Sequence, residues 1–457
     1  MIIKKNKRIG IWGFGVVGQS VTRYLHDNGY EVGVMDKREF TPTEIEDFKQ
    51  KNITVYKQED KNKFFNSYEI LLSSPGVYIA NDYPTFLSKW VHELDLFYDL
   101  FNKPIIAITG SIGKTSVTHI IAKIFECAQK QICVGGNIGI PTFDLLPQQE
   151  NVELALLEVS SFQLHYCKQF APKLALLTNF HPNHLDHHTT EQEYFLAKCA
   201  IFAHQTENDY SLVPFELRSI VPPAAQGHKR AYFTTTELKT NQLVQLLPTE
   251  SVYFIENNTV MRYANDMTTA IINLSTLTPF SFVQNRLIAA SVCDIMQISP
   301  NILHPVAATL QLPAHRLEKI ASVDSVDFYN DSKATTTAST CAAVEQLKNR
   351  PLHLFLGGLS KGVDRAPFIA QLKNTVNFIY CFGSEAQELH TMCKKNNIPS
   401  AAFADLHTAF SACALTIKPG DSVLLSPAGS SYDLYKNYEE RGNHFKKLVE
   451  DYIQAII

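Results

Sequence analysis

Long apolar runs are missing from this chain of 457 residues. None approaches the roughly 18 residues that a membrane-spanning helix needs, so the sequence predicts no membrane span. A basic surplus is missing as well, because 41 lysines and arginines stand against 45 acidic residues, for a formal net charge of -4. Nucleic-acid-binding proteins usually carry a basic surplus or stripe, so this balance argues against a nucleic-acid partner.

Paired cysteines are also missing, because the nine cysteines are scattered and include no C-x-x-C motif. In a chain of this length we expect reduced, buried thiols in a cytoplasmic protein, and no disulfide framework. Fixed-period repeats and low-complexity tracts are absent too. The basic start, MIIKKNKRIGIW, breaks into glycines and lacks a small-residue cleavage site, so we expect a first strand there and no signal peptide.

What the chain does contain is a repeated alternation of apolar strands and amphipathic helices, which predicts an α/β fold with parallel sheets. The length predicts about two to three domains. The pattern restarts near residues 95 and 312, so we predict domains at 1–94, 95–312 and 313–457. Several of the expected strands end in polar residues, as in LLEVSS, LALLTNF and SVLLSPAGSS, and open α/β sheets bind ligands at that edge.

A first glycine-rich loop, Gly13-x-Gly15-x-x-Gly18, follows a short apolar strand and precedes an amphipathic helix. Asp36 comes about 20 residues further on, at the spacing expected for an acid that binds a ribose hydroxyl. Taken alone, this pattern predicts an NAD-dependent dehydrogenase or a nucleotide-sensing module.

A second loop, Gly110-Ser111-Ile112-Gly113-Lys114-Thr115, is the stronger signal. A buried strand at 105–108 precedes it and a helix follows, so backbone N–H groups at the helix start can hold phosphate oxygens. Lys114 would neutralise the β- and γ-phosphates, and the Thr115 hydroxyl would bind magnesium. The first glycine of the general pattern would fall at Ile108, and the alternative is a glycine turn followed by a chance Gly-Lys-Thr.

Three further features of the second region leave alternatives open. Glu158 ends a buried strand and is either a magnesium ligand or a capping or salt-bridged acid. Lys198, on an amphipathic helix, is expected from the sequence alone to be an ordinary surface lysine. Four histidines follow another strand, and they indicate either a zinc site or a surface loop, because nothing closes a zinc ligand set; they are His181, His184, His187 and His188.

Charged and hydroxyl-bearing loops follow strands of the third region. Asp331 and Lys333 lie in NDSKAT, Lys361 lies in GGLSKG, and SPAGSSYD follows another strand. Together these loops predict a cationic rim suited to a small anionic substrate. The alternative is a set of charged loops at a sheet edge.

These motifs, taken together, resemble those of the Mur ligases. The matching segments run in order through all three regions, and they are TGSIGKT, GGNIG, EVSSFQL, TNFHPNHLD, AHRLE, NDSKAT, GGLSKG and SPAGSSYDLYKNYEERGNHF. The resemblance implies an N-terminal Rossmann-like domain for a UDP-sugar, a central P-loop ATPase-type α/β domain, and a C-terminal Rossmann-like domain for an amino acid.

The resemblance also implies a reaction. The chain would be an ATP-dependent amide ligase that adds D-glutamate to UDP-N-acetylmuramoyl-L-alanine through an acyl phosphate, in cytoplasmic peptidoglycan precursor synthesis. The NDSKAT and YKNYEERGNHF segments favour D-glutamate over another amino acid such as L-glutamate. Two Mg²⁺ ions are implied, with Lys198 as a carbamate that completes the second site. We expect a monomer with neither a nucleic-acid partner nor a membrane span.

The resemblance assigns roles to single residues. Those implied for catalysis are Lys114, His184 and Lys198. Those implied to bind ATP are Gly110, Ser111, Ile112, Gly113, Lys114, Thr115, Ser116, Asn285, Arg316 and Asp331. Those implied to bind the UDP-substrate are Gly15, Val16, Val17, Asp36, Arg38, Asn137, Ser160 and His184. Those implied to bind D-glutamate are Lys333, Thr335, Lys361, Ser431 and Tyr438. Those implied to bind metal are Thr115, Glu158, His184 and Lys198.

The chain departs from the family pattern at a few positions. Ser281-Phe282 stands where a His-Asn pair is usual before Asn285, and Lys37 stands where a smaller polar residue is expected. Thr336 and Gly429 replace the asparagine and cysteine that are common in relatives.

Overall fold

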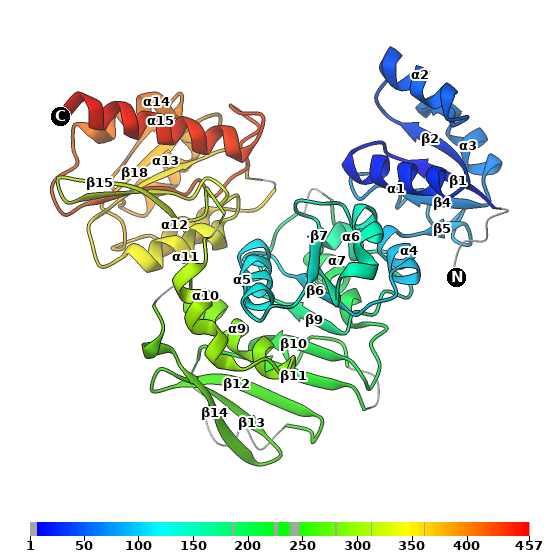
Figure 1. Cartoon of the computed structure of the whole chain (residues 1–457). Coiled ribbons are helices and arrows are strands. Elements are labelled where there is room, and N and C mark those ends of the chain that lie inside the picture. Colours follow the sequence, from blue (N-terminus) through cyan, green and yellow to red (C-terminus); the bar gives the residue numbers. More distant parts are fainter. Residues whose placement is uncertain are drawn as a thin grey trace. The chain divides into compact units, whose positions relative to one another are not determined.

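The computed structural model describes residues 7–184, 187–223, 227–236, 238, 246–278, 281–311, 313–360 and 362–456. The chain divides into two compact units, Met1–Phe180 with Gln192–Leu310, and His181–Glu191 with Gln311–Ile457. Three sheets carry the fold, two in the first unit and one in the second (Figure 1). The predicted α/β class is confirmed.

The first sheet has five parallel strands in the order β3-β2-β1-β4-β5. Its strands are β1 (Arg8–Trp12), β2 (Glu31–Asp36), β3 (Thr54–Lys57), β4 (Ile70–Ser73) and β5 (Trp90–Val91). Its helices are α1 (Val16–Asp27), α2 (Pro42–Gln50) and α3 (Lys61–Ser67), with a 3-10 turn η1 (Gln58–Asp60). The chain order reverses between β1 and β4, which makes the carboxyl edge of these two strands the expected ligand crevice.

The second sheet has nine strands in the order β14-β13-β12-β11-β10-β9-β6-β8-β7. Across the sheet from β7 at one edge to β12, all neighbouring strands pair in parallel. The pairs β12–β13 and β13–β14 are antiparallel, which the sequence analysis did not predict. The strands are β6 (Ile105–Thr109), β7 (Ile132–Gly136), β8 (Leu154–Glu158), β9 (Leu174–Leu177), β10 (Tyr210–Pro214), β11 (Lys229–Phe233), β12 (Glu250–Glu256), β13 (Thr259–Ala264) and β14 (Met267–Asn273).

Helices cover this sheet because their apolar faces need partners. Val117, Ile120, Ile121 and Ile124 recur at helical spacing on α5, and they pack with α9 residues in one core. The helices of the region are α4 (Glu93–Leu100), α5 (Lys114–Cys127), α6 (Ser161–Leu164), α7 (Glu191–Cys199), α9 (Val283–Ile295) and α10 (Leu303–Thr309). Its 3-10 turns are η2 (Thr142–Asn151), η3 (Ala200–Phe202), η4 (Phe215–Leu217), η5 (Leu274–Thr276) and η6 (Pro300–Ile302).

The second unit is built on six strands in the order β15-β16-β20-β17-β18-β19, all pairing in parallel except β15 with β16. The strands are β15 (Glu318–Val323), β16 (Val326–Asn330), β17 (Leu352–Gly357), β18 (Phe378–Phe382), β19 (Ser400–Phe403) and β20 (Ser422–Leu425). The helices are α11 (Thr337–Leu347), α12 (Ala366–Gln371), α13 (Ala386–Lys395), α14 (Leu406–Ala414) and α15 (Tyr438–Ile456).

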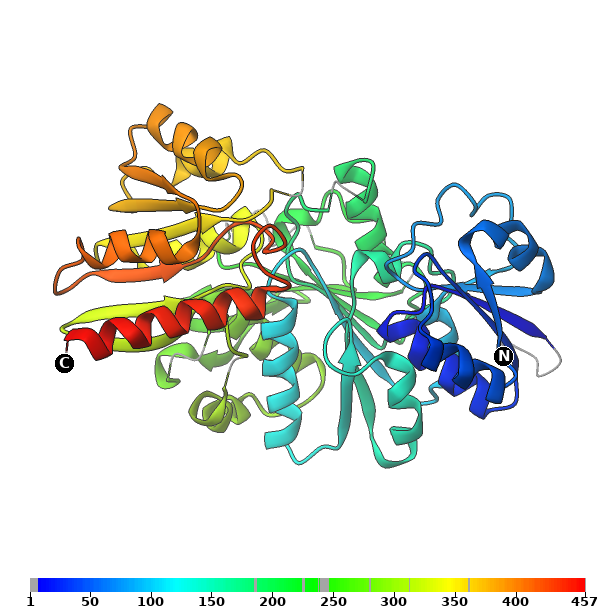
Figure 2. The same cartoon turned by 90° about the horizontal axis from the view of Figure 1, so that it is seen from above.

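The last helix runs along one face of this sheet (Figure 2, red). Phe445, Leu448 and Val449 bury the apolar side of α15, as the spacing predicts, and Tyr452 packs against the same core. The helix therefore fixes the loops at its N-terminal end, where several of the predicted substrate-binding residues lie.

All nine cysteines are free thiols in the structure. Six are buried and three, Cys127, Cys167 and Cys341, are half-buried. Among the described residues, no helix is both long enough and apolar enough to cross a membrane.

Candidate nucleotide-binding and catalytic site

The loop between β6 and α5 has the geometry of a phosphate-binding turn. Gly110 has a φ of 144° and Gly113, at the start of α5, has a φ of 81°, and both values favour glycine. A Cβ at Gly110 would lie 1.9 Å from Thr178 Oγ1, so a side chain there has no space. The first N–H groups of α5 have no partner inside the helix and carry its positive dipole end, as an anion requires.

Lys114 reaches back across this loop. Its Nζ donates to the carbonyl oxygens of Gly110, at 2.9 Å, and Ser111, at 3.3 Å. Thr115 follows in the first turn of α5 and is buried. The structure thus places a cation and a hydroxyl at the turn, as the sequence predicts.

Lys198 is buried, so the expectation of an ordinary surface lysine is wrong. Its Nζ donates to Gly110 O at 2.9 Å and lies 4.6 Å from the centre of the Tyr194 ring. Only 2% of the residue is exposed, because the face of α7 that carries Tyr194 and Lys198 packs toward the phosphate loop. Burial, reinforced by the charge of Lys114, holds the pKa of Lys198 well below its usual value.

Glu158 ends β8 with its carboxylate buried. Oε1 accepts from Asn137 Nδ2 at 3.0 Å, and the Asn137 N–H donates to Glu158 O at 2.7 Å. Oε2 is also buried and has no hydrogen-bond partner among the residues that the structure describes. An unpaired carboxylate oxygen is costly in such a place, so this oxygen fits a hard cation such as Mg²⁺.

Two other predicted residues of the first unit already have partners. Ser160 caps α6, accepting from Gln163 N at 3.3 Å and donating to Gln163 Oε1 at 3.0 Å. Asn285, in the first turn of α9, donates through Nδ2 to Ser281 Oγ at 2.9 Å. The serine that departs from the family pattern therefore orients the asparagine that the sequence analysis placed near ATP.

The histidine segment groups with the second unit. His184 has a φ of 56°, and its carbonyl oxygen accepts the N–H groups of His187 and His188 at 3.1 Å and 2.9 Å, which closes a turn. His188 is fully buried, and burial lowers the pKa of His181. These four residues therefore do not form a uniformly solvated surface loop.

Asp331 follows β16 at the carboxyl edge of the second unit's sheet. Its carboxylate accepts from Ser426 Oγ at 2.8 Å and from Leu317 N at 3.0 Å. Burial raises the pKa of Asp331 to about 7. Because these donors fix the carboxylate, the loop that carries Arg316 is tied to the end of β16.

Four of the five predicted D-glutamate residues lie at this same edge. Lys333 Nζ lies 4.9 Å from the centre of the Tyr438 ring, and the Thr335 N–H donates to Lys333 O at 2.9 Å. Ser431 is buried at the start of the turn that leads to α15. Lys361 lies outside the described residues.

Arg441 was not singled out from the sequence, although it is fully buried. Its guanidinium donates to Ser332 Oγ at 3.0 Å, to Ser332 O at 2.8 Å and to Gly429 O at 3.1 Å. It therefore joins the loop of Lys333 to the loop of Ser431. The signal was its helical spacing from Phe445 and Leu448, which places an arginine on the buried face of α15.

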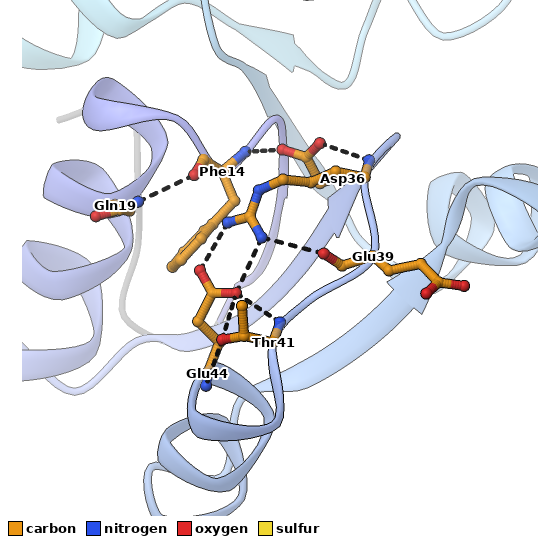
Figure 3. Close-up of polar contacts among 7 residues, drawn as sticks. Phe14, Gln19, Asp36, Glu39, Thr41 and Glu44 are labelled. Atoms are coloured by element: carbon orange, nitrogen blue, oxygen red, sulfur yellow. Dashed lines mark hydrogen bonds and ion pairs between the residues drawn. The ribbon is translucent and has the colours of Figure 1, made fainter.

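Figure 3 shows polar contacts among residues that follow β1 and β2 in the first sheet. Asp36 accepts the N–H of Phe14 and, at 3.0 Å, the N–H of Arg38, so its carboxylate closes the glycine loop. The Arg38 guanidinium forms a bidentate pair with Glu44 at 2.6 and 2.9 Å. Gly15 has open space where a Cβ would lie, so the start of α1 is accessible to an anion.

The sequence analysis missed Ser74, which borders the same crevice. Its N–H donates to Trp12 O at 2.8 Å, and a Cβ at Gly13 would lie 2.7 Å from the Ser74 Cβ. The available signal was the polar end of the strand in LLSSPG, at the point where the strand order reverses.

The Arg38–Glu44 pair makes a pH-dependent contribution to stability. The hydrogen bonds that Glu44 accepts from Arg38 and Thr41 lower the pKa of Glu44 to about 2. The contribution is therefore present above the usual pKa of 4.5 and is lost as the pH falls toward 2. We expect Glu44→Gln to lower the free energy of unfolding by about 0.5 kcal/mol at neutral pH, because the pair is partly exposed.

Urea unfolding of both proteins from about pH 7 to about pH 3 measures this difference, which should shrink steadily below about pH 5. Glu46→Gln on the same helix is the matched control, because Glu46 contacts only the Gln50 amide among the contacts described here, at 3.4 Å. A difference that stays constant over this pH range would contradict the assignment to the ion pair.

Three family models match consecutive parts of the chain. The model described as "Mur ligase MurD-like, N-terminal domain" matches residues 7–86. "Mur ligase middle domain" matches residues 108–293, and "Mur ligase, glutamate ligase domain" matches residues 315–429.

Similar proteins align over nearly the whole chain. A protein of Caldanaerobacter subterraneus subsp. tengcongensis named "UDP-N-acetylmuramoylalanine--D-glutamate ligase" is 30% identical over 98% of this chain and 99% of its own length. A protein of the same name from Acidobacterium capsulatum is 31% identical over 97% of this chain and 96% of its own. The solved structure of MurF ligase from Thermotoga maritima in complex with ADP shares the fold, with a TM-score of 0.59 and 17% identity over 97% of this chain and 95% of that one.

Proposed function

This chain belongs to the Mur ligase family, and from that premise we propose that it joins D-glutamate to UDP-N-acetylmuramoyl-L-alanine at the expense of ATP. It is an ATP-dependent amide ligase of peptidoglycan precursor synthesis. The observation that carries the local chemistry is the convergence of Lys114 and Lys198 on the Gly110 carbonyl.

The first chemical step is phosphoryl transfer to the terminal carboxylate of the UDP-substrate, giving an acyl phosphate. The N-terminal end of α5 and the Lys114 ammonium hold the phosphates and stabilise the charge that develops on them. The contacts of Lys114 with the carbonyl oxygens of Gly110 and Ser111 support this role, because they hold the ammonium over the loop. Phosphate oxygens bound there would replace these carbonyl oxygens as its acceptors. The remaining nucleotide contacts are proposed for Asn285, Arg316 and Asp331.

Two magnesium ions are proposed at this centre. The residues that would hold them are the Thr115 hydroxyl, Glu158, His184 and Lys198 as its carbamate. Bound magnesium supplies positive charge against the phosphate oxygens. The buried, unpaired Oε2 of Glu158 supports the first site. The lowered pKa of Lys198 supports the second, because only the neutral amine adds to CO2 to form a carbamate.

The second step is attack by the amine of D-glutamate on the acyl phosphate, followed by loss of phosphate from a tetrahedral intermediate. Lys333, Thr335, Lys361, Ser431 and Tyr438 are proposed to hold the two carboxylates of D-glutamate. Arg441 supports this arrangement, since its guanidinium keeps the loops of Lys333 and Ser431 together.

The first glycine loop is proposed to hold the UDP part of the substrate, so it is not a redox site. Gly15, Val16 and Val17 lie at the open start of α1, where a diphosphate would find N–H donors. Asp36 acts by closing the loop, since both of its described contacts are backbone N–H groups, and Arg38 borders it. Asn137 and Ser160 are proposed for the other end of the substrate, together with His184.

We assign residues 1–94 to the UDP-substrate, 95–312 to ATP and 313–457 to D-glutamate. A cytoplasmic location is supported by the nature of the proposed substrates, a nucleotide sugar and ATP, and by the free thiols. We propose that the protein acts as a monomer.

The test is phosphate release from ATP with UDP-N-acetylmuramoyl-L-alanine and one amino acid at a time. D-glutamate should give release, while L-glutamate, L-lysine and D-alanine should give none above background. Release with another amino acid alone would keep the ligase and overturn the D-glutamate assignment. No release with any of them, together with thermal stabilisation by NADH and not by UDP, would favour the dehydrogenase alternative and overturn the proposal.

A further inference from the structure

Asn179, two residues after the end of β9, contacts the phosphate loop through both its side chain and its backbone. Its Oδ1 accepts the Ile112 N–H at 3.0 Å, and its Nδ2 donates to the Ile112 carbonyl oxygen at 3.1 Å. The Asn179 carbonyl oxygen also accepts the Ser111 N–H at 3.2 Å. Asn179 therefore forms hydrogen bonds with both the N–H and the carbonyl oxygen of Ile112, and with the N–H of Ser111.

The neighbouring residue completes this attachment. Thr178 donates through Oγ1 to the same Ile112 carbonyl oxygen at 2.7 Å, and its N–H donates to Thr109 O at 2.9 Å. Its own carbonyl oxygen accepts from Gln284 Nε2 at 2.8 Å. The end of β9 thus fixes the loop and also the first turn of α9, which carries Asn285.

This attachment limits which backbone donors remain for an anion. The N–H groups of Ser111 and Ile112 are already directed at Asn179. The other backbone donors of the turn are the N–H groups of Gly113 and of the first residues of α5, which a helix cannot satisfy internally. The loop therefore directs anion-binding groups from the helix end, and Lys114 reaches over the other half.

We infer that Asn179 is a positioning residue for the nucleotide, which holds the loop from Ser111 to Gly113 in the conformation that aims the α5 N–H groups at the ATP phosphates. The inference rests on the proposed function, in that it takes ATP to be the ligand of this loop. Asn179 acts through the backbone of Ile112, so its loss affects ATP binding more than the later chemistry.

Asn179→Ala removes both side-chain contacts with Ile112. We expect the KM for ATP to rise at least tenfold, while kcat falls less than threefold and the KM values for the UDP-substrate and D-glutamate stay within twofold. Asn179→Asp keeps the acceptor for the Ile112 N–H but places a second oxygen against the Ile112 carbonyl and a negative charge near the phosphates. It should raise the KM for ATP more than alanine does.

Gln205→Ala is the matched control. Gln205 is a buried amide of the same unit that joins two segments, donating to Pro172 O and Tyr210 O at 2.8 Å. It should lower the thermal midpoint and leave the KM for ATP unchanged. If the Asn179 variants raise all three KM values equally, or change only the thermal midpoint as Gln205→Ala does, the positioning role is overturned.

Calorimetric titration with ADP separates this inference from the proposed function. Weaker ADP binding by at least tenfold in either Asn179 variant supports the positioning role even if D-glutamate proves to be the wrong amino acid. Unchanged ADP binding in a folded Asn179 variant overturns the positioning role even if the wild-type protein is an active ligase. Should Asn179→Ala fail to fold, Asn179→Asp supplies the same comparison.

Discussion

Replacement of Lys198 by alanine is expected to lower kcat by about 10³-fold, which is the size of effect seen when a group that stabilises charge in the transition state is removed. The reason is that Lys198 lies buried against the phosphate loop, with its amine 2.9 Å from Gly110 O and its pKa held well below the usual value by burial. A neutral amine at that place can become a carbamate and present oxygen to a metal ion. Alanine can do neither.

Rescue experiments distinguish this role from simple damage to the fold. Bicarbonate should not restore activity to Lys198→Ala, because no amine is left to react. A short carboxylic acid should restore it partly, because it can bring an oxygen ligand into the space that the side chain leaves. Lys123→Ala is the control, since Lys123 pairs with Glu126 on the exposed side of α5, and it should keep full activity. Full activity in Lys198→Ala itself would rule out the carbamate role.

Glu158→Gln is expected to change activity and stability in opposite directions. The neutral amide is a poor ligand for Mg²⁺, so kcat/KM should fall by about 10²-fold or more and the requirement for Mg²⁺ should rise. In the absence of metal, the free energy of unfolding should increase by about 1–3 kcal/mol, because the variant no longer buries a carboxylate oxygen without a partner. Urea unfolding without Mg²⁺ and rates across a Mg²⁺ titration measure the two effects.

Glu93→Gln provides the contrast. Glu93 is also a buried glutamate of the first unit, but its two oxygens accept from Thr142 Oγ1 and Gln163 Nε2. Replacing it should lower stability, because one amide hydrogen would face an existing donor, and should leave the Mg²⁺ requirement unchanged. A Glu158→Gln protein that loses stability, or that keeps its Mg²⁺ dependence, would contradict the assignment of Glu158 to the metal.

The parts of the site that depend on local pattern could be predicted from the sequence. The strand from Ile105, the glycine turn and the apolar spacing along α5 identify the phosphate loop, because each is a property of neighbouring residues. The polar ends of β8 and β9 follow for the same reason. The three α/β regions could be predicted because strands and helices alternate in sequence.

Other parts depend on contacts between segments far apart in the chain. The burial of Lys198 was missed because an amphipathic pattern does not say which neighbour covers the polar residue on its inner face. Asn179 was missed because its partner is the backbone of Ile112, which no side-chain pattern reveals. The antiparallel strands from β12 to β14 were missed because the apolar runs that mark the parallel strands are weaker there.

The free thiols described above allow local opening of the structure to be measured by labelling the native side chains. Cys133, Cys199 and Cys293 are buried in the first unit, and Cys381, Cys393 and Cys413 are buried in the second. A thiol reagent reaches such side chains only when the surrounding structure opens, so the rate at which each becomes labelled measures the opening of its own neighbourhood. Labelling followed by peptide mass analysis would therefore compare how readily the regions of the nine-stranded and the six-stranded sheets open, and would identify which of the two a bound nucleotide keeps closed, without any engineered probe.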